Sequence, residues 1–370
     1  MTRRLLPLAA AALLALTAAC DSNATADDNN SVDTTALAAA TKAVEQASTA
    51  PTTLGLAEQL EALPTGKRIY EIEFPGPVGQ VVGDSVVEAC KSLGCEVTRV
   101  PMGLDPASQA AAWDRAVRDK PDAVVSAGVA TALVGKQVGQ LRDEGVKVVV
   151  FVSDANAGQD VDVNLAGPDR MAADGRLQAD WIADDSQGEA HVLAVDFPDL
   201  PYVQPWADAV KSELHRTCTA CTVGVDHYGF AIAKQFPSRV VSYLQQHPDV
   251  NYIALTYGDQ AVGLPQALSA AGLTQKVKIV GRAGTSLNFQ IIKDGGPQKA
   301  DVGFPVRLFS WGLVDTAARL LAGQDATTPY ASITQILTVD TMDFNPADNP
   351  SWFGVPDFEQ QFELSWGTAS

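Results

Sequence analysis

Five cysteines are the residues whose type and spacing most directly suggest chemistry in this 370-residue sequence. Cys218 and Cys221 form a C-x-x-C pair, and Cys90 and Cys95 are five residues apart. The C-x-x-C pair is expected after a helix rather than at the start of one, which argues against a thioredoxin-like site. No histidine is spaced to complete a zinc site with either pair. We therefore predict two local disulfides, Cys90–Cys95 and Cys218–Cys221, provided that the chain is exported.

The sequence contains none of the common catalytic or nucleotide-binding signatures. It has no H-E-x-x-H, no G-x-S-x-G, no Walker loop and no G-x-G-x-x-G motif. The four histidines, at positions 191, 215, 227 and 247, are scattered. We expect no enzyme activity, no bound metal and no cofactor.

The N-terminus indicates export. Arg3 and Arg4 precede an apolar run from Leu5 to Leu16, and small residues then lead to Cys20. This pattern is typical of a secretory signal and is too short for a stable membrane span. The ending L-T-A-A-C resembles a bacterial lipoprotein signal, in which Cys20 carries the lipid and residues 1–19 are removed. The alternative is ordinary cleavage near Ala19, which leaves Cys20 as a free thiol.

Charge and composition limit the partners and set the domain organisation. The net charge of −18 comes without a basic cluster, so nucleic-acid binding is not expected.

Residues 21–35 are polar and predict a flexible tether. Residues 36–63 are Ala-rich, and are broken by Pro51. The compact part starts near Gly66, and its length of about 300 residues suits two lobes rather than one core.

Apolar runs alternate with amphipathic segments throughout the compact part. Strands are predicted at 69–74, 95–101, 123–129 and 147–153, with helices between them, and the alternation restarts at residue 169. The helices predicted in this second half include 232–246 and 260–271. The continuous apolar run VVVFV is typical of a parallel strand covered on both faces. The pattern predicts an α/β fold of two doubly wound parallel sheets, with a ligand crevice at the carboxyl ends of their strands.

Several ordered segments carry a family resemblance. They are GKRIYEIEF, DPASQAAAWDRAVRDKPDAVV, HPDVNYIALTYGDQAVGLPQAL and VKIVGRAGT. They resemble the type I periplasmic binding proteins of the ribose and sugar class, which are receptors of ABC importers. The likeness covers about residues 67–340, and the lead-in resembles actinobacterial lipoprotein members of that group.

The resemblance implies two lobes joined by a three-strand hinge, near residues 164–167, 304–307 and 335–339. The N-terminal lobe would comprise residues 66–166 and 306–337, and the C-terminal lobe residues 167–305 and 338–345. Residues 20–65 would form the tether and lead-in. The aromatic residues of 346–370 predict an extension packed on the body.

The resemblance also places residues in the cleft, where sugar receptors hold hydroxyl groups. Several positions that are polar in the family carry other residues here. In the first lobe, Val78 and its neighbours follow the first strand, and Ala155 follows Asp154. In the second lobe and hinge, the replacements are Tyr202 (with Trp206 one turn on), Gly258 (between Tyr257 and Asp259), Ala283 (after Arg282) and Phe304. The full set of expected ligand-binding residues is Phe74, Val78, Gln80, Asp154, Phe197, Tyr202, Trp206, Tyr257, Asp259, Arg282 and Phe304.

Four of these residues have alternative roles. Asp154 either accepts a hydrogen bond from ligand or ends a strand in solvent, and Asp259 either binds ligand or caps a helix. Trp206 either lines the cleft or packs beneath it. Arg282 either pairs with a ligand carboxylate or forms a structural salt bridge.

The expected ligand and partner follow from this set of residues. Loss of hydroxyl-binding groups and gain of aromatic surface leave two ligand classes open: a carbohydrate or polyol, and an aromatic, cyclic or amphipathic metabolite. The expected function is a monomeric substrate-binding lipoprotein on the outer face of the cytoplasmic membrane, with an ABC permease as partner. The alternative partner is a chemoreceptor or sensor kinase.

Overall fold

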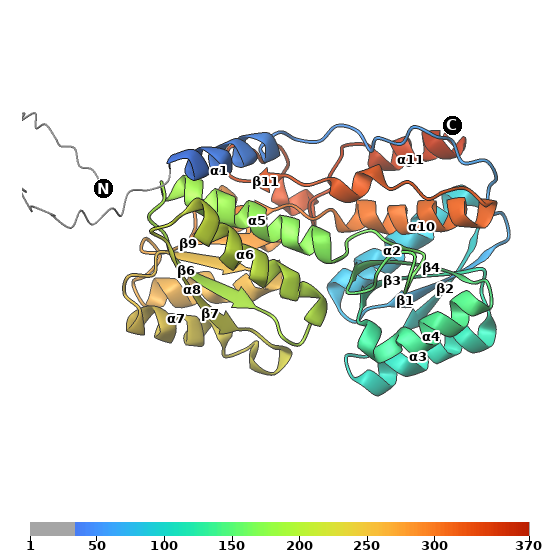
Figure 1. The fold of residues 1–370 in the computed structure, drawn as a ribbon, viewed down its shortest axis with the longest axis horizontal. Helices are drawn as coiled ribbons and strands as arrows, with labels where there is room; N and C mark the ends of the chain where they lie inside the picture. The colour runs from blue at the N-terminus through green and yellow to red at the C-terminus, as the bar shows by residue number, and fades with distance from the viewer. Residues whose placement is uncertain (1–33, 370) are drawn as a thin grey trace, which may run out of the picture. The chain divides into compact units, whose positions relative to one another are not determined.

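The computed structural model describes residues 34–369 and contains two α/β lobes, each built around a largely parallel sheet (Figure 1). The predicted fold class is therefore confirmed. The predicted signal peptide, Cys20 and the first part of the tether lie outside the described residues. Within residues 34–369, no helix combines the length and the apolarity needed to cross a bilayer.

The first lobe has a sheet in the order β2-β1-β3-β4-β5, with all neighbouring strands parallel. Its strands are β1 (Arg68–Glu73), β2 (Glu96–Pro101), β3 (Ala123–Val129), β4 (Lys147–Ser153) and β5 (Val163–Asn164). Its helices are α2 (Pro77–Leu93), α3 (Pro106–Asp119), α4 (Thr131–Asp143) and α10 (Val306–Ala322). The Asp105 carboxylate accepts the Ser108 N–H at 2.9 Å and caps α3, as the Asp-Pro pair predicts.

The second lobe has a sheet in the order β11-β10-β9-β8-β6-β7. Its strands are β6 (His191–Asp196), β7 (Thr222–His227), β8 (Tyr252–Leu255), β9 (Lys278–Arg282), β10 (Gln298–Val302) and β11 (Ile336–Leu337). Its helices are α5 (Pro168–Asp185), α6 (Gln204–Thr217), α7 (Phe236–Gln246), α8 (Leu264–Ala270) and α9 (Ser286–Lys293). Only β11 runs antiparallel to its neighbour within this sheet.

Two helices of the second lobe begin later than the sequence pattern predicts. The helix expected from Ile232 begins at Phe236, and the helix expected over 260–271 is split into a 3₁₀ turn at Gly258–Ala261 and α8. Gly263 lies between these two pieces with φ of 75°, in the left-handed region. A proline stands in the first turn of both α7 and α8, where it fits the helix start but cannot continue a preceding helix.

The chain passes between the lobes at three places near those expected. The first connection follows β5 into α5, the second follows β10 into α10, and the third follows α10 into β11. Since Ile336 pairs with Val302 of β10, residues 336–337 belong to the second sheet, which corrects the predicted boundary at 337. Arg170 links the three connections, because it lies in the first turn of α5 and donates to the carbonyls of Ala331 at 2.8 Å and Gly303 at 3.4 Å.

The segments before β1 and after β11 also pass from one lobe to the other. Helix α1 (Thr34–Ala47) lies along α5, whereas α11 (Phe358–Trp366) packs on α10 of the first lobe (Figure 1). Between these helices, Leu54 N–H donates to Gln361 at 2.9 Å, and Leu60 N–H donates to the Ser365 carbonyl at 2.8 Å. The lead-in and the C-terminal extension are therefore bound to each other and to both lobes.

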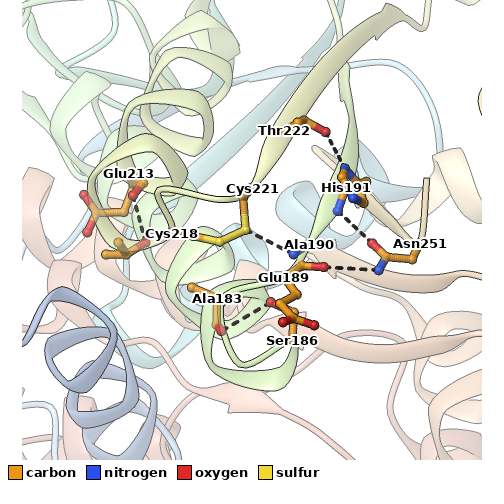
Figure 2. The surroundings of a disulfide bond; sticks show 11 residues. Ala183, Ser186, Glu189, Ala190, His191, Glu213, Cys218, Cys221, Thr222 and Asn251 are labelled. Carbon is orange, nitrogen blue, oxygen red and sulfur yellow. Dashed lines mark hydrogen bonds between the residues drawn. A yellow bond between two sulfur atoms is a disulfide. The ribbon is translucent and has the colours of Figure 1, made fainter. Parts of the chain in front are cut away.

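Both predicted cysteine pairs have their sulfur atoms within bonding distance, and their Cα atoms are 4.9 Å and 5.3 Å apart. Figure 2 shows the Cys218–Cys221 pair in the turn after α6. Cys221 Sγ accepts the Ala190 N–H at 3.2 Å, and the next N–H, of His191, donates to Asn251 at 2.8 Å. The pair thus holds the α6–β7 turn against β6.

Glu71 is a buried carboxyl group on strand β1 of the first sheet, and it makes the stability of this lobe dependent on pH. Its oxygens have no hydrogen-bond partner among the described residues, and Arg99 Nε is 3.9 Å away. Burial, followed by the charge of Glu73, raises the pKa of Glu71 to about 8. The folded protein therefore keeps a proton that the unfolded chain loses near pH 4.5, and stability falls as pH rises through this interval up to about 8.

We expect Glu71→Gln to raise the free energy of unfolding by about 1–3 kcal/mol at pH 8, because glutamine needs no proton to be neutral. The gain should shrink to zero below pH 5. Urea unfolding between pH 5 and 9 measures it, and Glu73→Gln on the same strand is the matched control, since Glu73 is paired with Arg99 at 2.9 Å. An equal gain in both variants would contradict the role of burial.

Candidate functional site

A cavity of about 170 Å³ lies between the lobes. The first lobe contributes Phe74, Val78, Gly128 and Phe151 to its wall, and the hinge contributes Phe304 and Val306. The second lobe contributes Phe197, Tyr202, Tyr228, Phe230, Tyr257, Asp259 and Gln260. Residues from both lobes meet here, as a site that closes on a ligand requires.

The wall is built where strands end. Phe74 follows β1 directly, Phe197 follows β6 and Tyr228 follows β7, while Tyr257 and Phe304 stand two residues after β8 and β10. Parallel strands bring these positions to one edge of each sheet, which is where open α/β folds bind ligands. The topology therefore gathers aromatic side chains that are far apart in the sequence.

Phe197 is at the centre of the aromatic cluster in the second lobe. Its ring meets those of Tyr228 and Phe230 edge-on, each with centroids 4.9 Å apart, and that of Tyr257 at 6.3 Å. Such edge-to-face pairs add about 0.5–1.5 kcal/mol each to the burial of the rings. The cluster is therefore a fixed surface against which a ligand can pack.

Tyr202 and Phe74 approach each other from the two lobes at Gly128. Gly128 has φ of 71°, and a Cβ there would lie 2.9 Å from Phe74 Cδ2 and 3.2 Å from the Tyr202 hydroxyl. The absent side chain leaves room for both rings. Burial raises the pKa of Tyr202 well above its ordinary value, so its hydroxyl stays neutral and can donate a hydrogen bond.

Asp259 is the one charged side chain among the described residues of the wall. It forms no ion pair within residues 34–369 and stays exposed in the cleft. Its apolar surroundings raise its pKa above the usual value, and burial together with the Asp259 charge raises the pKa of Tyr228. The helix cap considered for Asp259 is not what the structure shows, since the residue lies inside the 3₁₀ turn Gly258–Ala261.

Arg282 and Trp206 lie behind the wall, which corrects their predicted place in the cleft. Arg282 is fully buried, its Nε is 2.7 Å from Asp174, and its guanidinium carbon lies 4.6 Å from the centre of the Phe304 ring. The Trp206 indole is also fully buried and donates to Gln178. Neither side chain is part of the cavity wall, so both residues follow their structural alternatives.

Asp154 and Gln80 are also outside the wall. Asp154 accepts the Thr131 N–H at 2.8 Å at the start of α4, which is a structural role. Gln80 is exposed on α2. The other seven expected residues line the cavity: Phe74, Val78, Phe197, Tyr202, Tyr257, Asp259 and Phe304.

Three aromatic residues of the wall were missed by the sequence reasoning. Tyr228 and Phe230 follow the end of β7, and this position alone could have marked them. Phe151 lies within the apolar run of β4, where nothing distinguishes a cavity residue from a core residue.

Three larger hollows lie elsewhere on the described surface. One of about 440 Å³ lies over α4 and the loop at residues 159–162, and one of about 560 Å³ lies beside the hinge around Arg170 and Asn164. The third, of about 320 Å³, lies between the lead-in at residues 53–59 and the C-terminal extension. None of them collects the strand ends of both sheets. We therefore take the smaller aromatic cavity as the candidate site.

Comparison with known proteins agrees with this geometry. Residues 75–325 match the model of a family described as periplasmic binding protein domain. The sequence matches no curated protein.

Solved structures share the fold at low sequence identity. An ABC transporter solute-binding protein from Agrobacterium vitis with bound allitol is 18% identical, with a TM-score of 0.65 over 75% of this chain and 97% of its own. A glucose-galactose binding protein, GanP, from Geobacillus stearothermophilus is 17% identical, with a TM-score of 0.67 over 75% and 99%. A solute-binding protein from Thermotoga lettingae in complex with 5-methylthioribose is 16% identical, with a TM-score of 0.64 over 81% and 93%.

Proposed function

Because the chain belongs to the periplasmic binding protein family, we propose that it is an exported receptor that captures a small solute between its lobes and delivers it to an ABC importer. The observation that carries this proposal is the cavity between the lobes, whose wall comes from the strand ends of both sheets. A ligand that contacts both lobes favours their closed arrangement, which gives a transporter a bound form to recognise.

The solute is proposed to contact the seven expected residues that line the cavity, together with Phe151, Tyr228 and Phe230. Related structures hold allitol and 5-methylthioribose, a polyol and a sugar derivative with an apolar substituent. The aromatic wall of this chain suits a ligand with an apolar face.

A thermal-shift screen of the mature protein against sugars, polyols and small aromatic compounds tests this function. A true ligand at 100 times its Kd adds about 2.7 kcal/mol of stability, and bound compound should be recovered chemically unchanged. Absence of any hit, or turnover of the compound that binds, would count against a transport receptor.

We also propose that Cys20 carries a lipid that holds the receptor at the outer face of the membrane. Cys20→Ser should release the protein into the soluble extracellular or periplasmic fraction, since its anchoring group is lost. Fractionation and intact mass measurement test this, and the same mass spectra report whether both cysteine pairs are oxidised. A Cys20→Ser protein that stays with the membrane would contradict the lipid anchor.

A further inference from the structure

Resting on the proposed function, we propose that the solute is a small cationic ring compound, with an apolar or aromatic ring between the lobes and a protonated amine against Asp259. The cavity wall supports the ring, and its single charged side chain supports the amine. Proteins bind ammonium ligands elsewhere with the faces of aromatic side chains.

The charge of the wall favours a cation over a neutral or anionic ligand. Asp259 is exposed in the cleft and has no cationic partner among residues 34–369. When a ligand fills the cavity, water leaves this carboxylate, and an unpaired buried carboxylate is strongly unfavourable. A protonated amine removes that penalty directly.

The neighbouring aromatic rings also favour a cationic ligand. Phe197 and Tyr257 line the same cavity as Asp259, and Tyr228 is close enough for the Asp259 charge to raise its pKa. Aromatic faces carry negative electrostatic potential, so they attract a cation and repel an anion.

A bare sugar fits this wall less well. Apart from Asp259, the wall offers three tyrosine hydroxyls and the side-chain amide of Gln260. The Gln260 carbonyl oxygen already accepts the Thr256 N–H at 2.8 Å and the Tyr257 N–H at 3.1 Å, whereas its Nε2 has no partner among the described residues and is one donor left for a ligand. The remaining surface is Phe, Val, Leu, Ala and Gly. Each sugar hydroxyl buried there without a partner would cost about 1–3 kcal/mol.

A carboxylate ligand is also disfavoured, although an arginine lies nearby. Arg282 is fully buried and bound to Asp174, and the rings of Phe304 and Tyr257 lie against its guanidinium, 4.6 Å and 5.6 Å from its central carbon. The Nη1 and Nη2 atoms of Arg282 have no hydrogen-bond partner among the described residues, but Arg282 is not part of the cavity wall. The one charged side chain of that wall is the Asp259 carboxylate, which repels a ligand carboxylate.

The volume sets the size of the ligand. A cavity of about 170 Å³ is close to the engineered cavity of about 150 Å³ that binds benzene in another protein. A six-membered ring with one or two further heavy atoms fills it. Larger solutes would require the lobes to separate.

Three probes that share one ring and differ only in the head group test the proposal. Benzylamine is cationic at pH 7, benzyl alcohol is neutral and benzoate is anionic. Calorimetric titration of the full mature protein should give benzylamine a Kd at least tenfold below that of benzyl alcohol, with no measurable binding of benzoate. Ribose, glucose and allitol titrated in parallel report on the sugar alternative.

Asp259→Asn and Asp154→Asn form the matched pair of variants. Asp259→Asn should raise the Kd of benzylamine at least tenfold and leave that of benzyl alcohol unchanged. Asp154→Asn, which changes a nearby carboxylate outside the wall, should leave both constants unchanged. Equal loss in the two variants would place the amine somewhere other than Asp259.

The remaining outcomes separate this proposal from the proposed function. Micromolar binding of a sugar without binding of benzylamine overturns the cationic ligand and leaves the transport receptor in place. Preference for benzoate overturns the charge argument and indicates that Arg282 pairs with the ligand carboxylate. Failure of all six compounds counts against the cationic ligand and against the cavity as a binding site.

Discussion

Asp174→Ala is expected to lower the free energy of unfolding by about 3–5 kcal/mol, because it leaves two buried guanidinium groups without their shared counter-charge. Asp174 is 2.7 Å from Arg170 Nε and 2.7 Å from Arg282 Nε, and all three side chains are buried. Arg170 also binds the hinge carbonyls of Gly303 and Ala331. The substitution should therefore lower the global free energy of unfolding and also disturb the cavity wall.

Asp315→Ala is the matched control for this prediction. Asp315 is another buried carboxylate, 3.1 Å from Arg319 Nε and 2.7 Å from the Trp366 indole nitrogen, but it lies between α10 and α11 away from the cavity. Both variants should lose stability in urea unfolding, and only Asp174→Ala should also weaken ligand binding. Undiminished stability of Asp174→Ala would mean that water or a rearranged partner compensates Arg282.

The regular elements could be predicted closely where the sequence pattern is uniform. The bounds expected for β3 and β4 are those observed, because both are short apolar runs that a parallel sheet buries on both faces. The pattern gave the wrong starts for α7 and α8, because the apolar periodicity continues through the residues before each helix. A proline in the first turn of each helix, and the left-handed Gly263 before α8, separate those residues from the helix. Local backbone chemistry decided those bounds.

The candidate site could be predicted only in part, because the sequence does not show how deep a side chain lies in the protein. Position after a strand identifies residues at the correct edge of the sheet, and the family resemblance placed Phe197, Tyr257 and Phe304 in the cleft. Neither shows whether a side chain reaches the cavity or turns beneath it. Arg282 ends β9 at that edge, yet its guanidinium packs under Phe304 because Asp174 of α5 holds it there.

The terminal segments show a second limit of sequence reasoning. Residues 34–66 and 338–369 have no counterpart in the alternation of strands and helices, so their role depends on long-range contacts. Trp311 stacks on Trp366 with ring centroids 5.4 Å apart, and Phe344 packs on Phe289 at 5.2 Å. Aromatic content predicted that the C-terminal extension packs on the body, but not that it connects both lobes.

Tyr202→Ala and Phe304→Ala are each expected to weaken binding of the best compound from the thermal-shift screen by about 10- to 100-fold, or about 1.4–2.8 kcal/mol. Tyr202 belongs to the second lobe and meets Gly128 of the first, and Phe304 belongs to the hinge. Each ring forms part of the wall, so its removal takes away contact surface that a bound ligand buries.

Two comparisons separate lost contacts from lost folding. Phe304 packs on Phe309 at 4.9 Å, so Phe304→Leu keeps apolar volume if the alanine variant unfolds, and it should lose less affinity. Tyr243→Ala, on α7 and away from the cavity, should bind normally. Circular dichroism melting confirms that each variant is folded before titration. Unchanged affinity in both Tyr202→Ala and Phe304→Ala, with folding intact, would show that the ligand binds outside this cavity.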